Sequence, residues 1–377
     1  MKILQILPAL GQGGVERGTI EIAAALSRAG IPNGVVSSGG VMVNDLEKMG
    51  VAHYTLPVQS KNPFVVYRNA KAISKIVKEN GYTLMHVRSR APAWSVYKAS
   101  KKTRVPMLAT YHGIYGTSPR WLKIPYNRVM LKGVKVIAVS DWVRRHIMDV
   151  YGVEDSFIEL IHRGADLNKF KYGSVSDEEV KLFKEKYSIP SGMPVITLPG
   201  RLTSLKGQDI LLKALKVMRN KNVCCVFAGS DQGRVEYSAY LHSLAKELPE
   251  ETKCVFIDNV REMPSLYVAS DVVVSANSSK PESFGRTIPE AQAMGTITVA
   301  TRHGGACETI EDGVTGFLVT PGSVDELARK IDDVLEMSFE DREEMSKKSV
   351  ESVKRNFSTQ KMCESTIELY KRLHEGK

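Results

Sequence analysis

The sequence predicts a parallel α/β protein of two domains. Short apolar runs alternate with longer helical patterns along the chain, which is typical of parallel α/β architecture. The 377 residues are too many for one ordinary hydrophobic core. A polar stretch at residues 174–186, followed by Ser-Ile-Pro-Ser-Gly at 188–192, has the composition of a linker. We therefore expect domains at residues 1–187 and 188–358.

The first domain is expected to alternate strands and helices. Strands are predicted at residues 3–7, 34–38, 84–87, 107–110 and 134–139. A glycine-rich turn at residues 11–14 leads from the first strand into a helix, and further helices are predicted at 65–80 and 93–101. The glycines of this turn would allow a phosphate or a sugar to approach the first helix closely.

The second domain repeats the pattern. Strands are predicted at residues 195–198, 223–228, 255–257, 272–275 and 297–300, with a helix at 208–218 and a helical tail after residue 339. In open parallel sheets, ligands bind beyond the carboxyl ends of the strands. The loops that follow these strands are therefore the places to look for a site.

Composition narrows the class of protein. The chain is 43% hydrophobic and 25% charged, as in ordinary globular proteins. It has no apolar run long enough to span a membrane, and its N-terminus does not read as a signal peptide. The five cysteines are odd in number and lack metal-ligand spacing. We expect reduced thiols in a cytoplasmic protein.

The net charge of +10 is concentrated in the first half of the chain. Residues 1–188 hold 28 basic and 15 acidic residues, whereas the remainder holds 24 and 27. This asymmetry suggests an anionic partner, which would be a phospholipid surface, an anionic glycolipid or nucleic acid, unless the basic face is merely solvated. The aromatic and basic run at residues 119–130 could lie at a membrane surface or form a plain exposed helix.

Residues 280–295 carry the strongest indication of a site. Glu282 and Glu290 lie on either side of a small-residue loop that runs into a helix, where unpaired backbone N–H groups favour an anion. Carboxylates beside an anion are better suited to hold hydroxyl groups. Arg201 and Lys206, five positions apart in another loop that follows a strand, could both reach one diphosphate. Together these residues predict a sugar-nucleotide site.

Other motifs are weaker or absent. His112 follows a strand and precedes a glycine, so it could contact a sugar hydroxyl or serve as a structural histidine. The glycines around Gly13 and Gly14 do not complete a dinucleotide fingerprint. The sequence has no Gly-x-Ser-x-Gly motif and no metal-ligand cluster, so we expect no essential metal and no cofactor.

The combined motifs resemble those of glycosyltransferase family 4. They are Gly13-Gly14-Val15-Glu16, Tyr111-His112-Gly113, Val139-Ser140, Gly200-Arg201 with Lys206-Gly207, the Glu282/Glu290 pair, Gly304-Gly305 with Glu308, and the run at residues 312–319. The resemblance implies a GT-B fold of two Rossmann-like domains facing across a cleft and a retaining, metal-independent reaction. It also implies that a C-terminal helix at 359–377 returns to the first domain. Arg163 departs from the family pattern, which usually has Asn before this glycine.

The resemblance also implies roles for residues. Arg201 and Lys206 would hold the donor diphosphate, Glu282 the transferred sugar and Glu290 the ribose. His112 would meet the sugar near the reacting carbon. Backbone groups would line the diphosphate, and the residues implied are Gly13, Gly14, Ser283, Phe284, Gly285, Arg286 and Thr287.

The sequence gives weaker indications of the sugar donor and of the acceptor. Glu262 falls where the nucleobase is expected, and a carboxylate there could accept from guanine, which slightly favours GDP-mannose over a UDP-sugar. The basic first half favours a lipid-linked glycan or lipopolysaccharide-type acceptor at the inner face of the cytoplasmic membrane. The alternatives are a GT-B epimerase acting on UDP-GlcNAc and, more remotely, a nucleic-acid-binding protein, for which no recognised binding motif is present.

Overall fold

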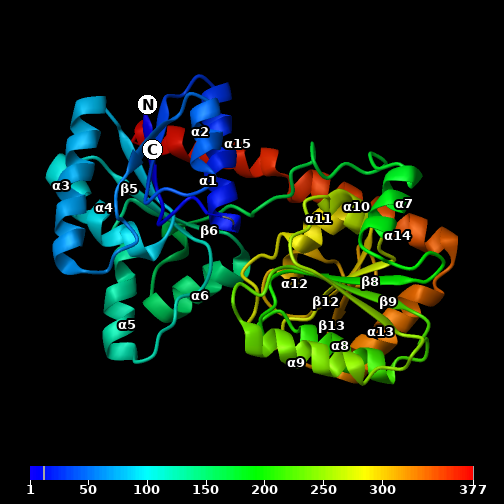
Figure 1. Ribbon diagram of the computed structural model, residues 1–377. Helices are drawn as coiled ribbons and strands as arrows, with labels where there is room; N and C mark the ends of the chain where they lie inside the picture. The colour runs from blue at the N-terminus through cyan, green and yellow to red at the C-terminus, as the bar shows by residue number, and fades with distance from the viewer. Residues whose placement is uncertain (12, 377) are drawn as a thin grey trace. The chain divides into compact units, whose positions relative to one another are not determined.

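A computed structural model describes residues 1–11 and 13–376 of the chain. The chain divides into two compact units (Figure 1). The first comprises residues 1–163 and the C-terminal segment from Thr359, and the second is Gly164–Ser358. Each is an α/β unit with its own parallel sheet.

The first unit is built on a seven-stranded sheet with the order β3-β2-β1-β4-β5-β6-β7. All of its strand pairs are parallel, and helices cover the sheet (Figure 1). Its strands are β1 (Ile3–Ile6), β2 (Asn33–Ser37), β3 (Ala52–Thr55), β4 (Leu84–Val87), β5 (Met107–Tyr111), β6 (Lys135–Ala138) and β7 (Ile158–Leu160). Its helices are α1 (Gly14–Arg28), α2 (Val43–Lys48), α3 (Pro63–Asn80), α4 (Arg90–Thr103), α5 (Arg120–Asn127), α6 (Asp141–Tyr151) and α15 (Thr359–His374), with short 3₁₀ turns at Arg128–Leu131 and Asp155–Phe157.

The C-terminal helix α15 packs on the first unit, as the family resemblance implies. Its buried face places Met362, Leu369 and Tyr370 in one core cluster with Ile22 and Leu26 of α1. Burying such apolar side chains contributes roughly 1.5–3 kcal/mol each. Because its partners come from the start of the chain, α15 closes the first unit with the last segment of the sequence.

The second unit has a six-stranded parallel sheet with the order β10-β9-β8-β11-β12-β13. Its strands are β8 (Val195–Pro199), β9 (Cys224–Ala228), β10 (Lys253–Ile257), β11 (Val272–Ser275), β12 (Ile297–Thr301) and β13 (Phe317–Val319). Its helices are α7 (Asp177–Lys186), α8 (Gln208–Val217), α9 (Val235–Lys246), α10 (Met263–Val268), α11 (Thr287–Ala293), α12 (Ala306–Thr309), α13 (Val324–Glu336) and α14 (Phe339–Asn356).

The expected linker at residues 174–186 is wrong, because most of it forms helix α7. Ser176 and Glu179 form a capping box: the Ser176 hydroxyl accepts from the Glu179 N–H at 3.3 Å, and the Glu179 carboxylate accepts from the Ser176 N–H at 2.8 Å. Phe183 is buried in the core of the second unit. The chain therefore passes between units at Arg163 and Gly164, about 24 residues before the expected boundary.

The strands that sequence analysis missed are short. Ala52–Thr55, Ile158–Leu160 and Phe317–Val319 each lie at an edge of a sheet and contain three or four residues. Edge strands have a neighbour on one side only, so they need not carry the long apolar runs that mark central strands.

Candidate functional site

The second sheet reverses its strand order between β8 and β11. Such a reversal is the switch point of an open α/β sheet, where ligands generally bind beyond the carboxyl ends of the two strands. The loop after β8 contains Arg201 and Lys206, and the loop after β11 contains Glu282. Three of the residues predicted from sequence therefore lie at the position where open α/β sheets bind ligands.

The structure brings Lys206 and Glu282 together as an ion pair. Lys206 Nζ donates to Glu282 Oε1 at 2.5 Å, and the two side chains are only 17% and 30% exposed. The other carboxylate oxygen, Oε2, is inaccessible to solvent and accepts no hydrogen bond from any residue in the described part of the chain. Because a buried acceptor without a donor is costly, Oε2 is suited to receive a ligand hydroxyl.

Close backbone contacts hold the Lys206 loop. Gly207 has φ +74°, and a Cβ there would overlap the carbonyl oxygen of Ala276. Asn277 Nδ2 donates to the Leu205 carbonyl at 2.7 Å, which joins the loop after β8 to the loop after β11. These contacts fix the lysine beside Glu282, and sequence analysis did not identify Asn277.

The Glu282 loop is fixed from its other side by the two glycines after β12. The Gly305 N–H donates to the Glu282 carbonyl at 2.9 Å. Cβ atoms at Gly304 and Gly305 would overlap backbone atoms of Glu282 and Phe284, respectively. The Gly304-Gly305 pair therefore lets two loops pack at backbone contact distance.

Glu290 lies in the first turn of α11 and contacts Tyr267 and Arg286. Its Oε2 accepts from the hydroxyl of Tyr267 at 3.2 Å, and its Oε1 lies 3.4 Å from Nε of Arg286. Burial and the adjacent carboxylate raise the pKa of the Tyr267 phenol well above 10, so this hydroxyl remains a donor. A carboxylate has about four lone-pair positions, so Glu290 can accept further hydrogen bonds.

The remaining residues predicted for this loop differ in exposure. Phe284 is 4% exposed, and its ring packs against Phe357 with centroids 5.9 Å apart. Its side chain therefore belongs to the core of the second unit, and only its backbone could line a ligand. Ser283 and Thr287 are partly exposed beside it, and Gly285 has φ +77°, a conformation that favours glycine.

Arg201 and Glu262 have other partners. The exposed Arg201 donates from Nη1 to Gln232 Oε1 at 3.4 Å, in the loop after β9, rather than extending toward Lys206. Glu262 occupies the N-cap position of α10 without a side-chain capping bond. Its carboxylate accepts from Lys186 Nζ at 2.7 Å and from the Tyr187 hydroxyl at 3.2 Å. The hydrogen bond from Lys186 is the main cause of the lowered pKa of Glu262.

The first unit presents Gly13, Gly14 and His112 at the carboxyl ends of its central strands. Gly13 precedes α1 in an extended conformation, with φ −179°, and Gly14 is the first residue of the helix. The guanidinium of Arg163 donates from Nη1 to His112 Nδ1 at 3.0 Å and from Nη2 to the Gly14 carbonyl. Arg163 thus joins two predicted site residues, a contact that sequence analysis did not identify.

No group of three or more His, Cys, Asp or Glu side chains is placed to hold a metal within residues 1–11 and 13–376. Over the same residues, no helix has the length and apolar character needed to cross a bilayer.

Comparison with known proteins identifies the family of the chain. Residues 12–169 match the sequence model of Glycosyltransferase Family 4, and residues 179–351 match that of Glycosyl transferases group 1. A glycosyltransferase of Rickettsia africae ESF-5 is 38% identical, and its crystal structure superposes with a TM-score of 0.93 over 100% of this chain and 99% of that one. The chain belongs to glycosyltransferase family 4 and has the GT-B fold.

Two further relatives have names that mention a sugar nucleotide or an inositol phosphate. The crystal structure of Anabaena Alr3699/HepE in complex with UDP-glucose has 25% identity and a TM-score of 0.84, over 98% of this chain and 99% of that one. The D-inositol 3-phosphate glycosyltransferase of Mycobacterium tuberculosis is 24% identical over 98% of this chain and 78% of its own length.

Proposed function

We propose that this glycosyltransferase moves a hexose from a nucleotide sugar to a glycolipid or other lipid-linked glycan, with retention of configuration at the anomeric carbon. The observation that carries the proposal is the Lys206–Glu282 pair at the switch point of the second sheet. It combines a cation for a diphosphate with a carboxylate that has one oxygen left for a sugar hydroxyl.

The proposed reaction uses charge stabilisation. The bond between the anomeric carbon and the diphosphate oxygen breaks, and the negative charge that develops on the diphosphate is stabilised by Lys206 and, after it leaves Gln232, by Arg201. The acceptor hydroxyl attacks the same face of the sugar. Its proton passes to the leaving phosphate oxygen, so no protein base is required. Because these cations offset the charge, the reaction proceeds without a metal ion.

In the second unit we assign a sugar hydroxyl to Glu282 and the ribose hydroxyls to Glu290. In the first unit we assign a sugar hydroxyl to His112. Within the second unit we assign the backbone N–H groups of residues 283–287 to the diphosphate. Within the first unit we assign those of Gly13 and Gly14 to a phosphate group. Buried carboxylates are well suited to hydroxyl groups, because each can accept several hydrogen bonds.

For the donor we propose a UDP-linked hexose first and GDP-mannose second. The complex of Alr3699/HepE with UDP-glucose supports the first. The carboxylate of Glu262 supports the second, but it already holds Lys186 and Tyr187, and guanine would have to share it. A thermal-shift screen with UDP-glucose, GDP-mannose and ADP-glucose separates these donors, because a ligand that binds only the native state raises the melting temperature by mass action.

Product analysis tests the reaction itself. Incubation with the stabilising donor and a glycolipid extract should give a sugar-extended lipid and free nucleotide diphosphate, with activity retained in EDTA. Release of an epimerised sugar nucleotide without acceptor would contradict the transferase proposal and favour an epimerase. Loss of activity in EDTA that returns with added Mg²⁺ would contradict metal independence.

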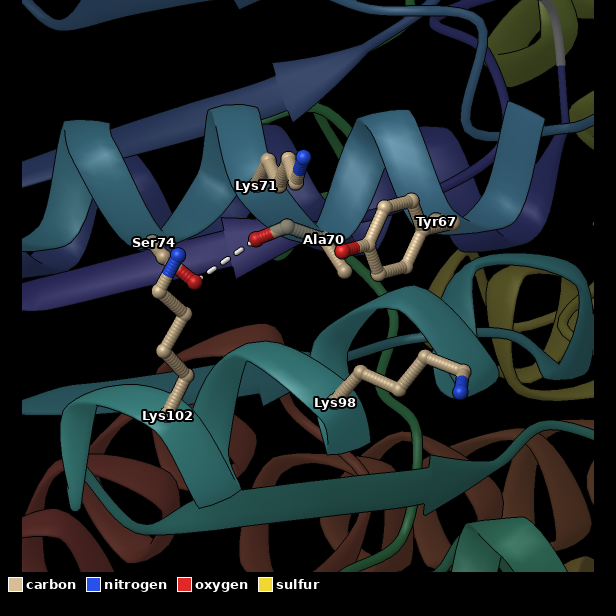
Figure 2. Close-up of a pocket in the computed structure, with 6 residues that line it drawn as sticks. All are labelled: Tyr67, Ala70, Lys71, Ser74, Lys98 and Lys102. Carbon is tan, nitrogen blue, oxygen red and sulfur yellow. Dashed lines mark hydrogen bonds between the residues drawn. The ribbon is translucent and has the colours of Figure 1, made fainter. Parts of the chain in front are cut away.

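The acceptor proposal rests on the basic surface of the first unit. A groove of about 140 Å³ between α3 and α4 is lined by Lys71, Lys98 and Lys102, together with Tyr67 and Ser74 (Figure 2). The three lysines are exposed. Such a cluster attracts anionic headgroups, each lysine contributing about 1 kcal/mol near an anionic surface.

Exposed aromatic residues accompany this charge. Phe64 is 82% exposed on α3 and Trp121 is 79% exposed on α5. Aromatic side chains of this kind are favoured at the headgroup level of a bilayer. We therefore propose peripheral contact of the first unit with an anionic membrane, at the cytoplasmic face where nucleotide sugars are available.

Sedimentation with vesicles tests this contact. The combined Lys71→Gln, Lys98→Gln and Lys102→Gln variant should bind phosphatidylglycerol vesicles at least tenfold more weakly than the unsubstituted protein, and neither should bind pure phosphatidylcholine. Lys216→Gln, in the second unit, is the matched control. Equal binding of the triple variant and the control would remove the groove from the proposal.

A further inference from the structure

In the hydrogen bond between Arg163 and His112, only Arg163 can be the donor. Arg163 Nη1 lies 3.0 Å from His112 Nδ1. A guanidinium has five N–H donors and no acceptor, so Nδ1 must be the acceptor in this hydrogen bond. A neutral imidazole whose Nδ1 accepts carries its hydrogen on Nε2.

The position of the Arg163 guanidinium is fixed from a second side. Its Nη2 donates to the carbonyl oxygen of Gly14, at the start of α1. On the next turn of α1, a Cβ at Gly18 would lie 2.8 Å from Arg163 Nη2 and 3.3 Å from Arg88 Nη2. Glycine at position 18 therefore leaves room for two guanidinium groups beneath the His112 loop. Arg163 is 6% exposed, so few alternative positions are open to it.

The other ring nitrogen of His112 is available. Nε2 is inaccessible to solvent, and within residues 1–11 and 13–376 it has no hydrogen-bond partner. A buried N–H group without an acceptor costs about 1–3 kcal/mol, which a ligand oxygen would relieve. The tautomer set by Arg163 thus leaves a buried N–H donor without an acceptor in the described residues.

We propose that Arg163 is a positioning residue that holds His112 as the neutral Nε2–H tautomer, so that this histidine presents a hydrogen-bond donor to an oxygen of the transferred sugar. The sugar rests on the proposed function, whereas the tautomer rests on the contact alone. The family's usual Asn at this position has both a donor and an acceptor on its amide, and would leave either tautomer possible. The fixed tautomer of His112 therefore depends on the arginine that this chain has at position 163.

The groups around His112 also oppose its protonation. Burial, followed by the charges of Arg163 and Arg88 and the neighbouring His86, lowers the pKa of His112 well below 6.5. Removing the Arg163 charge should move this pKa back toward 6.5, so the arginine has a measurable effect apart from geometry.

Nitrogen NMR of protein labelled with ¹⁵N-histidine tests the proposal without any substrate. The His112 signals are assigned from their absence in His112→Gln. In the unsubstituted protein we expect a protonated Nε2 and an unprotonated Nδ1 that do not titrate from pH 8 to 5.5. In Arg163→Met we expect a mixture of tautomers, because no donor then fixes Nδ1 as the acceptor. Arg163→Lys, whose ammonium also only donates, should keep the Nε2–H form.

Controls separate the proposal from unfolding and from failure of the proposed function. Arg128→Met removes another arginine of the first unit, which donates to the Tyr151 carbonyl, and should leave the His112 signals unchanged. A hydrogen on Nδ1 in the unsubstituted protein would overturn the proposal even if Arg163→Met does not fold. An unchanged tautomer in folded Arg163→Met would also overturn it. A correct tautomer in a protein that transfers no sugar would refute only the proposed function.

Kinetics supply a second measurement once a donor is found. Arg163→Met should lower kcat by about tenfold or more and make it fall further toward low pH, with the donor KM less affected. A higher KM with unchanged kcat at every pH would show that Arg163 serves only to bind substrate, and would contradict its action through His112.

Discussion

The stability of the first unit should depend on pH through His86. His86 is fully buried in β4 and uses both ring nitrogens: Nδ1 is 2.5 Å from the Tyr370 hydroxyl, and Nε2 is 2.6 Å from the Thr110 hydroxyl. Burial, and then the charge of Arg88, lowers the pKa of His86 well below 6.5. The native protein therefore keeps this ring neutral in mildly acidic solution.

The difference in the pKa of His86 between the folded and unfolded states decides whether stability rises or falls with pH. The folded-state pKa is depressed, so the full contribution of His86 to stability is present above the unfolded pKa of about 6.5 and is lost as the pH falls toward the folded value. Below pH 6.5 only the unfolded chain takes up the proton. The slope approaches about 1.4 kcal/mol per pH unit, and the loss between pH 7.5 and 5 is about 2 kcal/mol. Domains of this kind are stable by only about 5–15 kcal/mol, so the change is measurable.

Urea unfolding followed by tryptophan fluorescence measures this loss in the right unit, because all 3 tryptophans, Trp94, Trp121 and Trp142, belong to the first unit. Between pH 7.5 and 5, His86→Gln should lose about 2 kcal/mol less stability than the unsubstituted protein. Other titrating groups are common to both proteins and cancel in the difference. His242→Gln, an exposed histidine of the second unit, is the control. Parallel pH profiles for the unsubstituted protein and His86→Gln would refute the reasoning.

Four substitutions in the second unit test the remaining interpretation. Lys206→Ala should lower kcat by ~10²-fold or more in a transfer assay, and a properly folded variant with normal turnover would remove Lys206 from the mechanism. Glu282→Gln should lower kcat but tighten binding of the product nucleotide diphosphate by about tenfold in calorimetry, since it removes a negative charge beside the lysine; weaker binding would contradict this. Gly207→Ala should lower both stability and turnover, because a Cβ at φ +74° would overlap the Ala276 carbonyl, and an unaffected melting temperature would count against the loop geometry. Ser176→Ala should cost about 1 kcal/mol in a circular-dichroism urea titration through loss of the α7 cap, whereas Ser174→Ala, outside the capping box, should not.

The central part of the fold could be predicted from sequence because its residues carry strong signals. The strands nearest the middle of each sheet, such as Ile3–Ile6 and Val195–Pro199, are buried throughout and are mostly apolar in sequence. Helix α7 was missed because it is mostly charged and contains only three apolar residues, Val180, Leu182 and Phe183. Its capping box at Ser176 and Glu179 was the signal that could have identified it.

The location of the candidate site could be predicted from sequence, but its internal contacts could not. Loops that follow parallel strands gather at one edge of a sheet, so Lys206 and Glu282 could be expected in one site. Their direct ion pair could not, because it depends on how the two loops close around Gly207 and Asn277. The contact between Arg163 and His112 joins residues 51 positions apart and depends on tertiary packing, which no local pattern records.

The Lys206–Glu282 pair also limits how a nucleotide sugar can be bound. A lysine that is fully neutralised by a carboxylate would stabilise a leaving diphosphate poorly, and a carboxylate committed to a lysine would bind a sugar poorly. The geometry avoids both outcomes, because the contact uses one of three ammonium hydrogens and one of two carboxylate oxygens. Lys206 can therefore turn a second N–H toward phosphate while Glu282 Oε2 accepts a sugar hydroxyl. As negative charge grows on the leaving oxygen, the attraction of Lys206 for the diphosphate strengthens relative to its attraction for Glu282. An interaction that grows in this way as the bond breaks is stronger in the transition state than in the ground state, which is the condition for catalysis.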